Sequence, residues 1–118
     1  MFKGGVSVKL AIIGSRSITD VRIADYIPEG VDEIVSGGAK GVDTLAKRYA
    51  IENFLKITEF LPQYELYGRA APLRRNDQIA QYADEALIFW DGASVGTRYT
   101  VRAFERLGKK VTLVKVEK

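Results

Sequence analysis

The chain has 118 residues, enough for one domain and too few for two, and it carries a net charge of +3. It contains no cysteine and no histidine, which excludes disulfides, thiolate metal sites and catalysis by a thiol or an imidazole. The mild positive charge permits an anionic ligand but does not demand nucleic acid. No apolar run approaches the ~20 residues of a membrane helix, so we expect a cytoplasmic protein without membrane partners.

Five short apolar runs alternate with helical patterns along the chain. The runs cover residues 8–13, 33–35, 57–61, 85–90 and 111–114. Helices are predicted from Thr19 to residue 27, from Val42 to residue 54, over residues 72–82 and from Thr97 to residue 107, and a polar stretch covers residues 63–69. We therefore predict one α/β domain over residues 1–118. It is a three-layer Rossmann-like domain with a five-stranded, mainly parallel sheet and helices on both faces.

Glycines, hydroxyls and cations follow the predicted strands, at the sheet edge where α/β domains bind ligands. Helices that begin at Val42 and Thr97 would present unpaired N–H groups there. Glycines would let a phosphate reach the main chain, and arginines would pair with it. The predicted ligand-binding residues are Gly14, Ser15, Arg16, Ser36, Gly37, Gly38, Ala39, Lys40, Gly41, Asp43, Arg75, Asn76, Asp91, Gly92, Ser94, Gly96, Thr97 and Arg98.

The stretch VSGGAKGVD, residues 35–43, is the strongest candidate for a phosphate-binding loop. It matches neither the G-x-x-x-x-G-K-S/T pattern of P-loops nor the dinucleotide pattern G-x-G-x-x-G. The alternative is an ordinary tight turn, with Asp43 serving only to stabilise the start of its helix. Two further alternatives stay open: Tyr64 and Tyr67 either stack a base or pack within a surface loop, and Trp90 either lines a pocket or fills the core.

Four motifs, AIIGSR at 11–16, VSGGAKGVD at 35–43, RNDQIA at 75–80 and GASVGT at 92–97, occur in an order that resembles the SLOG superfamily. This superfamily includes the DNA-processing protein DprA and the LOG phosphoribohydrolases, and the chain is most similar to small, stand-alone YspA-type SLOG domains of unknown function. The resemblance implies a Rossmann-like fold that binds nucleotides. Residues 37–43 and the helix start at Gly96 and Thr97 would hold phosphate, with Arg16 and Arg75 nearby. The resemblance also suggests a homodimer.

The resemblance departs from LOG enzymes at their catalytic motif, P-G-G-x-G-T-x-x-E. Here Asp91-Gly92-Ala93 replaces its opening, and Thr100 stands where the catalytic glutamate would be. The leading hypothesis is therefore binding or sensing of a nucleotide or nucleotide-derived ligand. A nucleotide-processing hydrolase, with Asp43 or Asp91 as general base and Mg²⁺ carried by the nucleotide, is the first alternative. DprA-like binding of single-stranded DNA is the second. No metal site built by the protein alone is predicted.

Overall fold

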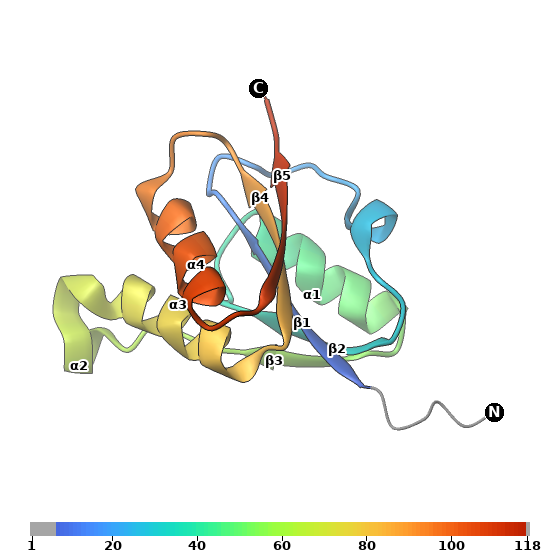
Figure 1. The fold of residues 1–118 in the computed structure, drawn as a ribbon, viewed down its shortest axis with the longest axis horizontal. Helices are drawn as coiled ribbons and strands as arrows, with labels where there is room; N and C mark the ends of the chain where they lie inside the picture. Colours follow the sequence, from blue (N-terminus) through green and yellow to red (C-terminus); the bar gives the residue numbers. More distant parts are fainter. Residues whose placement is uncertain (1–6, 118) are drawn as a thin grey trace.

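The computed structural model describes residues 7–117 of the chain, and they form a single parallel sheet with helices on both sides (Figure 1). The five strands lie in the order β3-β2-β1-β4-β5, and every neighbouring pair is parallel. The predicted Rossmann-like α/β architecture is confirmed, and the sheet is parallel throughout. The elements are β1 (Val8–Gly14), η1 (Ile23–Tyr26), β2 (Val31–Ser36), α1 (Val42–Glu52), β3 (Lys56–Glu59), α2 (Tyr64–Tyr67), η2 (Gly68–Ala70), α3 (Ala71–Tyr82), β4 (Glu85–Trp90), α4 (Val95–Arg106) and β5 (Lys110–Lys115).

Two hydrophobic cores lie on the two faces of the sheet. Helix α1 covers one face and contributes its buried residues Val42, Ala46 and Ala50, which recur every four positions. Helices α3 and α4 cover the other face, where Ile79 and Phe104 are fully buried (Figure 1). Alternate residues of β1 enter the two cores, so the strand is apolar on both faces, as expected for a buried parallel sheet.

The strand order creates a switch point beside the central strand β1. From β1 the chain steps outward through β2 to β3, then crosses back to β4 on the other side of β1 and continues to β5. The loops after β1 and β4 therefore diverge, and a crevice opens between them at the carboxyl edge of the sheet. This is the edge at which the sequence predicts a ligand site.

The helix predicted from Thr19 is wrong: the first crossover holds only the single 3-10 turn η1. Residues 15–18 are held by distant contacts instead, since Ser17 Oγ donates to Asp91 and the carbonyl of Ile18 packs against Gly41. Ile18 and Ile23 both reach the core, at a spacing of five that a helix does not place on one face. Tertiary contacts thus override the local helical pattern.

Other bounds differ from the predictions at the ends of helices. Helix α4 begins earlier than predicted because Ser94 caps it, its Oγ accepting the Thr97 amide at 3.3 Å. Helix α1 ends at Glu52, before the predicted end at residue 54, and Phe54 has a positive φ of 56° and is 96% exposed. The polar stretch 63–69 folds into α2 and most of η2, and Figure 1 shows α2 at one extreme of the molecule. No helix within residues 7–117 has the length and apolar character to cross a bilayer.

Candidate functional site

A hollow of about 460 Å³ opens at the switch point, between the ends of β1, β2 and β4 and the starts of α1 and α4. We call it the switch-point pocket. Its volume lies within the usual range for small-molecule sites. Its lining residues are Ile13, Gly14, Ser15, Arg16, Ser17, Gly37, Ala39, Asp43, Pro72, Leu73, Arg75, Asn76, Ile79, Asp91, Ser94, Gly96 and Thr97.

A second hollow of about 420 Å³ adjoins the first, and we call it the loop pocket. The two share a wall made of Arg16, Gly37, Ala39 and Arg75. The loop pocket is lined by Arg16, Gly37, Gly38, Ala39, Lys40, Pro62, Tyr64 and Arg75. The structure thus brings the loops after β1, β2 and β3 and the helix α3 to one continuous depression.

Most of the residues predicted to bind a ligand line one of these two pockets, and four do not. Ser36 is fully buried and accepts the Gly38 amide at 3.1 Å. Gly41 is the N-cap that precedes α1, Gly92 lies in a turn with a φ of 86°, and Arg98 is exposed on α4. Their part in ligand binding stays a prediction that neither pocket supports.

The sequence analysis missed the apolar side of the switch-point pocket, formed by Ile13, Pro72, Leu73 and Ile79. Pro72 and Leu73 begin α3, one turn before Arg75 and Asn76 on the same helix. The helical spacing of this segment was the available signal, because residues three and four apart share a face. Ser17, which also lines the pocket, directly follows the predicted Ser15 and Arg16.

Arg75 donates hydrogen bonds to the main chain of two loops. Its Nη1 donates to the carbonyl of Gly37 at 2.5 Å and to that of Phe60 at 3.4 Å, and its Nε donates to Asn76 Oδ1 at 2.8 Å. Burial lowers the pKa of Arg75, and the nearby Asp43 carboxylate opposes this shift. We predicted that Arg75 binds a phosphate. Some of its N–H donors are instead already hydrogen-bonded within the protein.

The glycines of VSGGAKGVD serve internal packing. A Cβ at Gly37 would collide with the guanidinium of Arg75. One at Gly41 would lie 2.7 Å from the carbonyl oxygen of Ile18, and Gly38 has a φ of 69° that favours glycine. The glycine content of this loop is therefore explained without a ligand. Any binding of an anion would depend on other groups.

The start of α4 supplies such groups. The first turn of a helix has N–H groups without intrahelical partners, and Ser94 satisfies only that of Thr97. Gly96 lines the switch-point pocket, and a Cβ there would meet no atom within 4 Å. At α1, the N-cap Gly41 offers no side-chain cap. The start of α4 therefore turns partial positive charge toward the switch-point pocket, whereas the start of α1 meets this pocket through the Asp43 carboxylate.

Arg16 is one of two exposed cations in the pocket linings, the other being Lys40. Arg16 lines both pockets, and its side chain is exposed whereas Arg75 is half-buried. The ion pairs within residues 7–117 involve Arg22, Lys56 and Arg74 rather than Arg16. Its guanidinium is thus available to an anion that enters from solvent.

The two candidate general bases, Asp43 and Asp91, have opposite environments. Asp91 accepts hydrogen bonds from the Ala93 amide at 2.9 Å, Ser17 Oγ at 2.7 Å and the Ser94 amide at 2.8 Å, which lower its pKa to about 2. Burial raises the pKa of Asp43, although the amide of Ala39 and the guanidinium of Arg75 oppose the shift. Asp43 is therefore the more basic of the two, and Asp91 anchors its own loop.

Thr100 and Trp90 both have hydrogen-bond partners within the protein. Thr100, at the position of the LOG glutamate, is fully buried; its Oγ1 donates to the Gly96 carbonyl at 2.9 Å and accepts from Asn76 Nδ2 at 2.8 Å. Trp90 is half-buried, and its indole N–H donates to the Ser94 carbonyl at 3.0 Å. Both side chains therefore stabilise the start of α4 through hydrogen bonds to its main chain.

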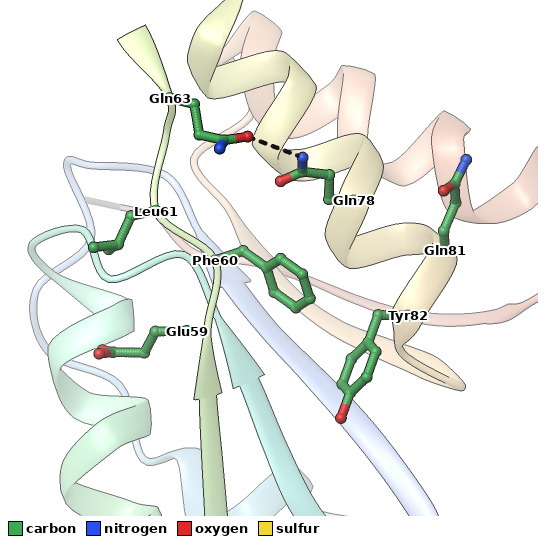
Figure 2. Close-up of a pocket in the computed structure, with 7 residues that line it drawn as sticks. All are labelled: Glu59, Phe60, Leu61, Gln63, Gln78, Gln81 and Tyr82. Atoms are coloured by element: carbon green, nitrogen blue, oxygen red, sulfur yellow. Dashed lines mark hydrogen bonds between the residues drawn. The ribbon is translucent and has the colours of Figure 1, made fainter. Parts of the chain in front are cut away.

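A further hollow of about 750 Å³ shares no lining residue with this site and lies between the end of β3 and helix α3 (Figure 2). The rings of Phe60 and Tyr82 lie along it with centroids 5.4 Å apart, and Gln78 donates to Gln63 at 3.4 Å. Glu59 is the one charged residue in its lining. This groove therefore does not favour an anion. No cluster of three or more carboxylates suited to a metal ion occurs within the described residues.

The chain is similar to a phage protein. The chain is 35% identical over 81 residues to "Gene 61 protein" of Mycobacterium phage D29. The match covers 64% of this chain and 65% of the phage protein, so it spans just under two thirds of that relative. No family model matches the chain. No solved structure matches it. These comparisons identify no function for the chain.

The lowered pKa of Asp91 should make the free energy of unfolding depend on pH in the acid range. Because its pKa is about 2 in the folded state and ~3.9 in an unfolded chain, its stabilisation is complete above pH ~4 and is lost as the pH falls toward 2. Asp91→Asn should therefore destabilise the protein most near neutral pH, and the difference from wild type should shrink between pH ~4 and ~2. Urea unfolding followed by circular dichroism across this range measures it.

The control for this experiment is Asp20→Asn, because Asp20 is exposed and lies outside both pockets. A difference between Asp91→Asn and wild type that stays constant from pH 2 to pH 7 would contradict the assignment.

Proposed function

We propose that the switch-point pocket and the loop pocket together bind a nucleotide or a nucleotide-derived ligand, and that the protein acts as a binding or sensing module. One observation carries the proposal: the open start of α4 and the exposed Arg16 line a single hollow at the switch point of the sheet. The apolar side formed by Leu73 and Ile79 suits the uncharged part of such a ligand. The resemblance to SLOG domains points to the same ligand class and is part of the proposal.

Native mass spectrometry of freshly purified protein tests whether a nucleotide co-purifies. A mass increment that disappears on denaturation, and that matches a nucleoside phosphate, is the expected result. Protein that carries no such increment and binds no nucleoside phosphate in calorimetry would overturn the proposal.

Substitution of Arg16 separates ligand binding from folding. Arg16→Ala should weaken binding of a nucleoside phosphate about tenfold, because one charged hydrogen bond to the phosphate is lost. The thermal midpoint should not change, since the side chain is exposed. Arg98→Ala is the matched control, because Arg98 is also an exposed arginine but lines neither pocket. Equal affinities of the two variants in calorimetry would remove Arg16 from the site.

A nucleotide hydrolase is the second candidate, and it is favoured by the buried Asp43 at the pocket wall with its raised pKa. Asp91 is disfavoured as a base because its carboxylate already accepts three hydrogen bonds. Any Mg²⁺ would arrive with the ligand's phosphates. An assay of turnover on a panel of nucleotides and nucleotide sugars decides between binding and hydrolysis.

Binding of single-stranded DNA is distinguished by its response to salt. Contacts to several phosphates release counterions, so affinity for an oligonucleotide would fall steeply as salt rises. The cations around the loop pocket, Arg16, Lys40 and Arg75, would make such contacts. A flat salt dependence would remove this candidate.

A further inference from the structure

We infer that the loop pocket is a subsite for the base of a nucleotide, with the ring stacked on Tyr64 while the phosphate occupies the switch-point pocket. This inference rests on the proposed function and deepens it. It names the ligand class as a nucleoside 5′-phosphate, in place of a sugar phosphate or inorganic phosphate.

The site is divided into two adjoining hollows of similar volume. A single phosphate group fills only a small part of a pocket of about 460 Å³, and a second hollow of similar volume shares a wall with the first. Gly37 and Ala39 form part of that wall together with Arg16 and Arg75, so both hollows are bordered by the same two guanidinium groups. A ligand with two chemically different parts therefore fits the pair better than a compact anion.

The loop pocket is lined by one aromatic ring, a proline and three cations. Tyr64 and Pro62 supply its ring-shaped surfaces, and Arg16, Lys40 and Arg75 supply its charges, with no carboxylate in the lining. Bases stack on aromatic side chains and on guanidinium groups, whatever their identity. Tyr64 is 56% exposed, so its ring is accessible to such a partner.

The phosphate is expected at the start of α4. The open first turn of α4 borders the switch-point pocket and not the loop pocket. Gly96 leaves free space in front of that turn, so an anion can approach the amides closely. Arg16 lines both hollows and can contact the phosphate and the base at the same time. The helix start thus fixes one end of the ligand and Tyr64 the other.

Calorimetry of the full chain with ribose 5-phosphate and with the four ribonucleoside 5′-monophosphates tests the assignment. At least one monophosphate should bind about tenfold or more tightly than ribose 5-phosphate, in the range found for stacking of one base. Tyr64→Ala should abolish this difference and leave the affinity for ribose 5-phosphate unchanged. Tyr64→Phe, which keeps the ring, should retain it.

Tyr67→Ala is the matched control, because Tyr67 is an exposed tyrosine of the same helix that lines neither pocket. If ribose 5-phosphate binds as tightly as every monophosphate, or if Tyr64→Ala has no more effect than Tyr67→Ala, the base subsite is wrong while the proposed function stands. If none of these compounds binds, the proposed function fails and the subsite with it.

Discussion

Replacing Arg75 by alanine is expected to destabilise the protein by about 3 kcal/mol, which is a fall in Tm of roughly 12 °C for a domain of this size. The variant loses the hydrogen bonds that join the carbonyls of Gly37 and Phe60 to one guanidinium. It also removes the cation next to the buried Asp43. Thermal and urea unfolding by circular dichroism measure the effect.

Arg74→Ala is the control for Arg75→Ala. Arg74 is exposed and makes an ion pair with Asp77 at 3.0 Å within the same helix, so its loss should cost about 0.5 kcal/mol or less. Arg75→Lys should recover little of the lost stability, because an ammonium group lacks the planar guanidinium whose Nη1 reaches the two loop carbonyls while its Nε donates to Asn76. Equal stabilities of Arg74→Ala and Arg75→Ala would show that Arg75 does not fasten the loops.

The second large effect is expected at Gly14, the last residue of β1. Gly14→Ala should destabilise the protein by about 2 kcal/mol, because a Cβ there overlaps the side chain of Val42 at the start of α1. Combining it with Val42→Ala relieves the overlap, so the double variant should be more stable than the sum of the single effects predicts. A double-mutant cycle measured by urea unfolding gives the coupling.

Gly96→Ala is the matched control for Gly14→Ala. It lies in the first turn of α4 with open space around its Cα, so alanine should be neutral or stabilise the protein by about 0.5 kcal/mol. If Gly14→Ala proves as mild as Gly96→Ala, or if Val42→Ala brings no relief, close packing between β1 and α1 is not the reason for glycine at this position.

The sheet was predictable because parallel strands buried on both faces leave continuous apolar runs. The run 85–90 coincides with β4, in which Ala86, Leu87, Ile88 and Phe89 are buried. The helix predicted from Thr19 failed because Ser17 is tied to Asp91, a residue 74 positions away. A local pattern does not reveal a partner at that separation.

The position of the two pockets was predictable, whereas the contacts made by their lining residues were not. The rule that ligand sites follow the carboxyl ends of parallel strands identified the loops that line the two pockets. The sequence did not reveal that Gly37 lies against Arg75, 38 positions away, or that the Asp91 carboxylate holds its own turn. These contacts form only when the sheet has assembled, so they carry no sequence pattern of their own.

The central position of β1 also affects how the chain folds as it is synthesised. Leu10 pairs with Ile34 on one side and with Glu85 on the other, so one edge of β1 has no neighbour until β4 has left the ribosome. Until then the nascent chain exposes an unpaired apolar strand of the kind that chaperones protect from aggregation. Ribosome-bound chains that end before residue 85 should therefore be sensitive to protease, and resistance should appear once β4 has emerged.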